Sequence, residues 1–184
     1  MSPARTSARC EPASARRIQP ARGKRRAQKE AARPRGWDPP SADGGAVYIG
    51  TLDNGGTEPE EPSTIQFSDF IGNTASRGGG LFINGFTWAN CSGCVFDYNT
   101  ATSLGGAVYA LTDYTRSLKL ELCTFCFNGA GEHGGSVYSA GSFGFDMTIA
   151  QCIFAFGTGG GVVQAEDYGT IAPQYCVAFG NAGG

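Results

Sequence analysis

The sequence lacks several features that would point to common classes of protein. It has no uninterrupted apolar run of 18 residues, so it contains no candidate membrane-spanning helix. No apolar stretch follows its first basic residues, which excludes a recognisable secretory signal. It has one histidine, His133, and no G-x-x-x-x-G-K-[S/T] loop. A phosphate-binding loop is therefore excluded, and a Ser-His-Asp or Cys-His catalytic set would need partners for His133 that we cannot identify.

Positive charge is scarce outside the N-terminal segment. Of the 14 Lys and Arg residues, 11 lie in residues 1–43 beside four acids, whereas residues 44–184 hold three bases and 12 acids. The net charge of −2 thus combines a segment of +7 with a body of −9. Residues 1–43 have no apolar stretch that could pack, so we predict a basic disordered arm, followed by one domain over residues 44–184.

The basic arm has three interpretations. It could be a nucleic-acid arm built on Arg22, Lys24, Arg25 and Arg26, an Arg-rich organelle transit peptide, or a solvated tail translated from a start codon upstream of the true one. We favour the solvated tail, because no aromatic residues are interleaved with the bases to stack on nucleotides. Nucleic acid is accordingly a disfavoured partner.

The body of the chain is repetitive. A glycine pair precedes an apolar segment five times, as GGAVY at 44, GGGLF at 78, GGAVY at 105, GGSVY at 134 and GGGVV at 159. A second motif runs SDFIGN at 68, CVFDYN at 94, CTFCFN at 123, CIFAFG at 152 and CVAFGN at 176. The spacings of 26, 29, 29 and 24 residues are shorter than those of paired-helix repeats, which run from about 33 to 47 residues.

Each repeat unit reads as a set of short strands, because β-branched and aromatic residues alternate between Gly and Asn turns. Leu118, Leu120 and Leu122 share one parity, and Cys123 and Phe125 continue on the other. Such a change of parity indicates a corner where the chain begins a new face. A unit of this size cannot bury its own apolar side, but stacked copies can. We predict an all-β, right-handed parallel β-helix of about five coils, with three short strands per coil.

Stacking should place equivalent side chains above one another. The predicted ladders are a small-residue ladder of Ser68, Cys94, Cys123, Cys152 and Cys176, an aromatic ladder of Phe70, Phe96, Phe125 and Phe154, and an amide ladder of Asn73, Asn99, Asn128 and Asn181. The Asn residues are expected at sharp turns, because Asn tolerates positive φ and its amide can bond to the next coil. The first glycine of each pair should serve a second corner.

The glycine-pair strand offers two series for the interior. Position four holds Val47, Leu81, Val108, Val137 and Val162, and position five holds Tyr48, Phe82, Tyr109, Tyr138 and Val163. Neighbours on a strand face opposite sides, so only one series can point inward. We favour the aliphatic one, which would leave an external aromatic stripe as a candidate contact surface.

The alternation of GGAVY with FIGN, FDYN and FCFN resembles the repeats of the chlamydial polymorphic outer-membrane proteins. The resemblance covers roughly residues 44–184 and rests on several copies in register. It implies an exposed β-helix passenger of an autotransporter with a role in adhesion, at the cell surface or outside the cell. This chain shows neither a secretory signal nor a C-terminal membrane barrel, in contrast to that family.

Seven cysteines invite a search for a metal site. Cys91-x2-Cys94 and Cys123-x2-Cys126 look like two halves of a zinc site, but the 28 residues between them exceed the usual spacing. The repeat register explains Cys94 and Cys123 as inward ladder members and places Cys126 on the outward side. We expect buried thiols, with a disulfide between adjacent coils as the alternative, and we expect neither a metal nor a cofactor.

One pair of carboxylates recurs in register. Asp113 and Asp167 each lie eight residues after the first glycine of their repeat, and each precedes a tyrosine, Tyr114 or Tyr168. Two coils separate them, about 9.6 Å, which is close to the spacing of inverting glycosidase carboxylates. No Arg, Lys or His recurs in that register to assist, so solvated loop residues are the simpler interpretation.

Two functional hypotheses follow. The first is a non-catalytic surface or adhesive module that binds a host protein, an envelope protein or a polysaccharide. The second is a carbohydrate-active enzyme, lyase or hydrolase, or part of one. The final FGNAGG, residues 179–184, begins another repeat without its strand. From this we expect either a fragment of a longer protein or end-to-end self-association through the last coil.

Overall fold

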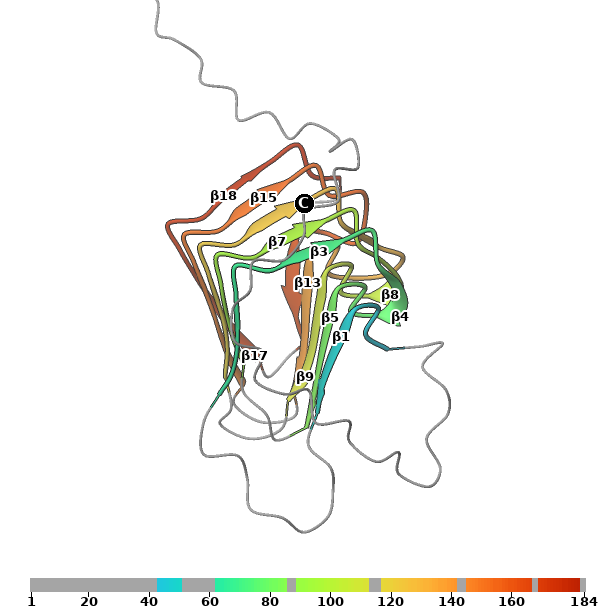
Figure 1. Ribbon diagram of the computed structural model, residues 1–184. Helices are drawn as coiled ribbons and strands as arrows, with labels where there is room; N and C mark the ends of the chain where they lie inside the picture. Colours follow the sequence, from blue (N-terminus) through green and yellow to red (C-terminus); the bar gives the residue numbers. More distant parts are fainter. Residues whose placement is uncertain are drawn as a thin grey trace, which may run out of the picture. The chain divides into compact units, whose positions relative to one another are not determined.

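The computed structural model describes residues 43–50, 62–85, 89–112, 117–141, 145–166 and 169–182. The predicted arm lies almost wholly outside these ranges. All elements in the described ranges are strands, so no helix there is long and apolar enough to cross a membrane. Every strand pairing among them is parallel, and strands from successive repeats lie above one another (Figure 1). The chain thus forms the predicted parallel β-helix.

Four parallel sheets form its sides. Sheet one holds β1 (Val47–Gly50), β5 (Leu81–Gly85), β9 (Val108–Thr112), β13 (Val137–Gly141) and β16 (Val163–Ala165). Sheet two holds β2 (Ser63–Gln66), β6 (Ala89–Ser92), β10 (Ser117–Glu121), β14 (Phe145–Ala150) and β17 (Gly169–Gln174). Sheet three holds β3 (Asp69–Ile71), β7 (Val95–Asp97), β11 (Thr124–Cys126), β15 (Ile153–Ala155) and β18 (Val177–Phe179). Sheet four holds β4 (Thr74–Arg77), β8 (Thr100–Leu104) and β12 (Gly129–Ala130).

Sheets one to three contain the three strands per coil that the sequence predicts, and sheet four adds a short fourth strand in three of the coils. This extra strand follows the amide ladder directly. Its residues, such as Thr100 and Ala101, pair in register with those of the neighbouring coils. The repeat motifs do not predict it, because TAS, TAT and GA share little beyond small size.

The interior holds the predicted aromatic ladder. Phe70, Phe96, Phe125 and Phe154 are buried, and their rings stack at 4.6–4.7 Å with interplanar angles of 3–10°. This spacing is close to the distance between neighbouring strands, so register alone brings the rings together. In the last coil Ala178 takes the aromatic position, because it pairs with Phe154. The predicted inward stacking of these rings is confirmed.

The amide ladder is also confirmed. Asn99 Oδ1 accepts hydrogen bonds from the backbone N–H and side-chain amide of Asn73, at 3.1 and 2.9 Å. Asn128 Oδ1 accepts the same pair from Asn99, at 2.9 and 3.1 Å. Gly157 interrupts the ladder, and its N–H donates to Asn181 Oδ1 at 2.8 Å. Because Asn99 and Asn128 are fully buried, these bonds satisfy amides that would otherwise destabilise the interior.

The turn conformation predicted for these asparagines is wrong. The residue before each asparagine carries the positive φ, as does Phe156 before Gly157, so the set is Gly72, Tyr98, Phe127, Phe156 and Gly180. We call this set the Tyr98 corner. A second set of corner positions, with positive φ at all five residues, comprises Phe67, Gly93, Leu122, Gln151 and Tyr175. We call it the Phe67 corner; it includes Leu122, after which the sequence predicts the change of parity.

In sheet one the aliphatic series points inward, as predicted. Leu81, Val108 and Val137 belong to the main core and the half-buried Val47 packs against it, whereas Phe82, Tyr109 and Tyr138 form a separate cluster on the outer side. The last repeat is an exception: Val137 pairs with Val163 and not with Val162. Both Gly160 and Gly161 have positive φ there, whereas only the first glycine of GGGLF does, so this corner takes up one more residue and the strand shifts by one.

Candidate functional site

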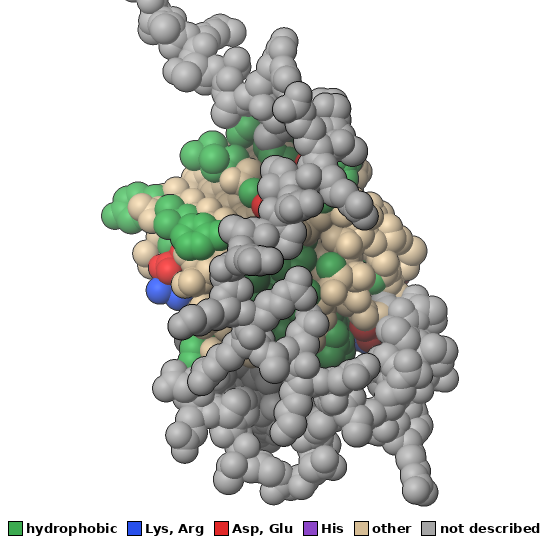
Figure 2. Space-filling view, in the orientation of Figure 1, with side chains coloured by type: hydrophobic (Ala, Val, Ile, Leu, Met, Phe, Trp, Pro, Cys, Tyr) green, Lys and Arg blue, Asp and Glu red, His purple; other side chains and the backbone are tan. Residues whose placement is uncertain are grey.

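Exposed apolar side chains are concentrated on one side of the β-helix. Nine large hydrophobic residues are exposed in the described ranges, and all except Tyr48 lie on sheet three or on the two corners that border it. These eight are Phe67, Ile71, Tyr98, Leu122, Ile153, Tyr175, Val177 and Phe179. Figure 2 shows hydrophobic side chains gathered over the region where β15 and β18 lie in Figure 1. We call the outer side of sheet three with its two corners the apolar face.

The most exposed members of the apolar face lie in the Phe67 corner. Tyr175 is 88% exposed, Phe67 is 83% exposed and Leu122 is 59% exposed. Each has a φ between 46° and 55°, in the left-handed region, which costs a non-glycine residue about 1–2 kcal/mol. Glycine is compatible with the same corner, as Gly93 shows. The chain therefore keeps large apolar residues at positions where they are both strained and solvated, which is a reason to look for an interaction there.

The Tyr98 corner forms the other border of the face. The ring of Tyr98 stacks on that of Phe127 at 4.7 Å, and Phe127 stacks on Phe156 at 5.2 Å. Phe179 from β18 then meets Phe156 edge-on at 5.2 Å. Stacking along the coil holds these rings in one orientation, so the border is a rigid aromatic ridge.

The charged side chains described on the apolar face are both acidic. Asp69 is exposed on β3, and Asp97 lies at the end of β7. One carboxylate oxygen of Asp97, Oδ1, is buried without a hydrogen-bond partner, and burial raises the pKa of this carboxyl. The described Lys, Arg and His residues lie elsewhere, at Arg77, Lys119 and His133. The face thus combines apolar contact area with a weak acidic character.

The predicted aromatic stripe on sheet one is a different surface. Its rings stack from Tyr48 through Phe82 and Tyr109 to Tyr138, at 5.0–5.8 Å. They do point outward, but Phe82, Tyr109 and Tyr138 are at most 4% exposed, whereas Tyr48 is 49% exposed. The stripe is therefore not the open contact surface expected from the sequence.

Polar side chains hold the stripe in place. The guanidinium of Arg77 lies 5.4 Å from the Phe82 ring centroid and 5.2 Å from that of Tyr109. It also donates two hydrogen bonds to Asp43, at 2.7 and 2.6 Å. The hydroxyl of Tyr138 donates to Glu166 Oε1 at 3.0 Å. These contacts already engage the two carboxylates, so this region acts as a packed outer cluster.

The sequence-predicted site residues Asp113, Tyr114, Asp167 and Tyr168 lie outside the described residues, so their pairing stays a prediction. His133 is exposed at its turn, with its ring 6.2 Å from that of Tyr138. Its neighbour Glu132 accepts a hydrogen bond from the Ser103 hydroxyl at 2.8 Å. Neither contact forms a nucleophile and base pair.

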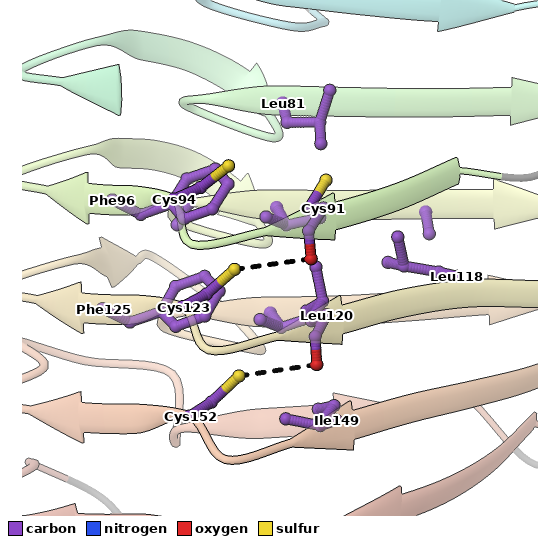
Figure 3. Packing of buried hydrophobic residues seen from close by; sticks show 14 of the residues in the cluster. Leu81, Cys91, Cys94, Phe96, Leu118, Leu120, Cys123, Phe125, Ile149 and Cys152 are labelled. Carbon is purple, nitrogen blue, oxygen red and sulfur yellow. Dashed lines mark hydrogen bonds between the residues drawn. The ribbon is translucent and has the colours of Figure 1, made fainter. Parts of the chain in front are cut away.

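The cysteine ladder lies in the interior, and its thiols bond to backbone carbonyls. Cys123 Sγ donates to the carbonyls of Glu121 and Cys91, at 3.2 and 3.6 Å, and Cys152 repeats this with Ala150 and Leu120, at 3.3 and 3.5 Å. Figure 3 shows the two bonds to the neighbouring coil, to Cys91 and Leu120. All six cysteines in the described ranges are free thiols, which excludes the predicted disulfide alternative among them. No cluster of three or more metal-ligating side chains occurs in those ranges.

Two of the buried thiols, Cys91 and Cys94, are poor nucleophiles, whereas the hydrogen bond with Cys123 lowers the pKa of Cys152. Burial raises the pKa of Cys91 well above its ordinary value, and the hydrogen bond with Cys123, together with burial, does the same for Cys94. Cys126 points to the outer side of sheet three, as predicted, yet it is only 5% exposed. Its position next to Asp97 in the strand register makes it part of the covered centre of that side.

The sequence-based interpretation missed the apolar face. The parity change at Leu122 marks the Phe67 corner, but the repeat motifs do not say which way its side chains point. The members of that corner differ in type, from Gly93 to Gln151 and Tyr175, so no motif joins them. The available signal was their common position, directly before the small residue of the second motif.

Comparison with known families finds one match. Residues 93–111 match the Chlamydia polymorphic membrane protein (Chlamydia_PMP) repeat. This segment runs from Gly93 of the Phe67 corner through β7 and β8 into β9, about two thirds of one coil, without its strand of sheet two. The chain thus carries a repeat of the kind predicted from GGAVY and FDYN. Neither the curated proteins nor the solved structures contain a match to the chain.

Proposed function

We propose that this chain is a non-catalytic, surface-displayed β-helix module that binds a protein partner through the apolar face. The observation that carries the proposal is the concentration of eight of the nine exposed large hydrophobic residues on sheet three and its two corners. Large contiguous apolar patches on soluble surfaces mark interaction sites. The match to a polymorphic membrane protein repeat supports a location at the outer membrane or cell surface.

A protein partner fits this surface better than a polysaccharide. Sugars are bound through hydrogen-bonding side chains next to accessible ring faces, whereas the rings of Tyr98, Phe127 and Phe156 use their faces to stack on one another. The exposed aliphatic side chains of Ile71 and Val177 offer dispersion contacts without polar groups. A host or envelope protein with its own apolar patch and basic rim would complement them.

The test replaces the apolar side chains of one corner without disturbing its backbone. Asn tolerates positive φ, so the triple variant Phe67→Asn, Leu122→Asn, Tyr175→Asn should keep the fold. Gln151→Asn is the matched control, because it alters the same corner at a position that is already polar. Binding of the labelled chain to cultured epithelial cells and to isolated bacterial envelopes is measured for each protein.

We expect the native chain and Gln151→Asn to bind one of these surfaces and the triple variant to lose at least about tenfold in affinity, equivalent to about 1.4 kcal/mol. Equal binding by the triple variant would overturn the assignment of the face. No binding of the native chain to either surface would overturn the adhesive function itself. The enzyme hypothesis stays a prediction based on Asp113 and Asp167.

A further inference from the structure

Both ends of the described β-helix present strands that pair on one side only. At one end these are β16, β17 and β18, and at the other they are β1, β2 and β3. Unpaired strand edges offer rows of backbone donors and acceptors to another chain, and proteins usually protect them with charged side chains. The six strands contain a single charged residue, Asp69. The edges are thus poorly protected against further pairing.

In the described residues, the apolar interior is less buried at the same two ends. In β16 and β17, Val163 and Ile171 are half-buried, whereas Val137 and Met147, which pair with them one coil earlier, are fully buried. At the other end Val47 is likewise only half-buried. Covering these side chains with another coil would remove apolar area from water and so favour association.

The amide ladder gives the two ends opposite hydrogen-bonding character. At each step the N–H of one coil donates to the Asn Oδ1 of the following coil, as Asn99 does to Asn128. The described ladder begins at Asn73, whose amide donates onward to Asn99, and ends at Asn181, whose Oδ1 accepts from Gly157. A coil following Asn181 would therefore have to provide an acceptor, and Asn73 of another copy has its Oδ1 in the required position.

The aromatic ladder is complementary in shape as well. Ala178 takes the ring position in the last coil and is exposed, so the space above Phe154 is filled only by a methyl group. Phe70 begins the ladder at the other end with a full ring. Phe70 of a second copy would meet this methyl group and continue the ladder from there.

We propose that the strands β16, β17 and β18 of one copy pair in parallel with β1, β2 and β3 of a second copy. In this register Asn73 follows Asn181, Phe70 lies over Ala178 and Asp69 lies opposite Val177. The interface is head-to-tail, so each copy keeps one free end and chains of copies form rather than closed dimers. This inference does not depend on which partner binds the apolar face.

Pro173 in β17 limits the strength of this contact. Gln174, its neighbour, accepts a hydrogen bond from the Gln151 N–H at 2.8 Å and so faces the preceding coil. Successive residues of a strand face opposite neighbours, so Pro173 faces the open edge, where it has no N–H to donate. One bond across the interface is therefore lost, and we expect association that depends on concentration rather than permanent filaments.

A designed disulfide tests the register. In the variant Asp69→Cys, Val177→Cys the two new thiols lie in one molecule four strand spacings apart, about 19 Å, so they cannot join within one copy. In the proposed contact they are direct neighbours between copies. With Cys10→Ser in the background, mild oxidation should convert the full-length chain into covalent dimers, trimers and higher species. The control variant Ile71→Cys, Val177→Cys places the two thiols two residues out of register. It should yield fewer than about a tenth as many covalently linked species.

Sedimentation velocity on the native chain gives the second measurement. The mean mass should rise with concentration, and Val177→Lys with Phe179→Lys, both at exposed positions, should return the protein to a monomer. Two results overturn the proposal: a native chain that stays monomeric at every concentration, or equal crosslinking by the in-register and out-of-register pairs. Unchanged circular dichroism of each variant shows that the fold is retained.

Discussion

Asp97 is the residue whose surroundings conflict most with its chemistry. It lies at the end of β7, beside Cys126 in the strand register, and its Oδ1 is buried without a partner. Burial raises the pKa of this carboxyl. The charged form of Asp97 is therefore less favoured in the folded protein than in the unfolded chain. The ionised carboxylate thus lowers the stability of the folded state.

The pH dependence of stability should reveal this. In the range just above the ordinary aspartate value, about 4, the folded protein binds more protons at Asp97 than the unfolded chain does. The contribution of Asp97 to stability therefore falls as pH rises through that range. We expect Asp97→Asn to match the native chain in urea unfolding below pH 4 and to exceed it at pH 7. The variant Asp69→Asn is the control for replacing a carboxylate by an amide. If the unfolding free energies of Asp97→Asn and the native chain differed by the same amount at both pH values, the explanation would be contradicted.

At the scale of elements, the ladders connect each coil to the next. Phe125 lies at the middle of the aromatic ladder, between Phe96 and Phe154, and it is fully buried. Removing its ring takes away two stacking contacts and leaves a cavity that the neighbouring strands cannot fill, because their backbone bonds fix the coil spacing.

Phe125→Ala should cost about 3–5 kcal/mol of unfolding free energy, as for other buried phenylalanines. Phe179→Ala is the comparison, since this ring lies on the outer side of β18 and is partly exposed; it should cost about 1 kcal/mol or less. Urea denaturation of both variants measures the difference. Similar losses of unfolding free energy for the two variants would mean that stacking in the interior adds little to stability beyond the burial of apolar area.

The elements that sequence reasoning predicted are those whose side chains must repeat. Phe96, Phe125 and the amides of Asn99 and Asn128 recur at equal spacing because an interior ladder needs the same residue type in each coil. The corners carry no such requirement, because a left-handed residue there has its side chain in solvent. Tyr98 and Gly72 fill equivalent positions, and so the apolar face left no motif to find.

The one-residue shift of register in β16 also arises at a corner. GGGVV at residues 159–163 has three glycines before its strand, as GGGLF at residues 78–82 does, but Gly160 and Gly161 both adopt positive φ whereas in GGGLF only Gly78 does. A count from the first glycine therefore put Val162 in the interior series in place of Val163. Glycine accepts both left- and right-handed conformations, so the sequence alone does not say how many glycines a corner absorbs.

At the scale of the whole molecule, the β-helix is a one-dimensional stack. Each coil contacts only its neighbours, as β10 contacts β6 and β14. Stability is then close to a sum of terms within coils and between adjacent coils. A coil in the middle is held from two sides and an end coil from one, so the ends should open first. The same arrangement extends the apolar face along every coil, which allows a partner to bind across several repeats.

Amide hydrogen exchange on the full-length chain tests this picture together with the end-to-end contact. At low concentration, peptides covering β10 and β11 should exchange at least about tenfold more slowly than those covering β17 and β18, because their amides open only after neighbouring coils separate. As concentration rises, β17 and β18 should gain protection while β10 does not change, since pairing with a second copy gives the edge strands a second neighbour. Uniform protection along the chain at low concentration would mean that the coils unfold as one cooperative unit. If the exchange protection of β17 and β18 did not change with protein concentration, their edges would not pair between copies.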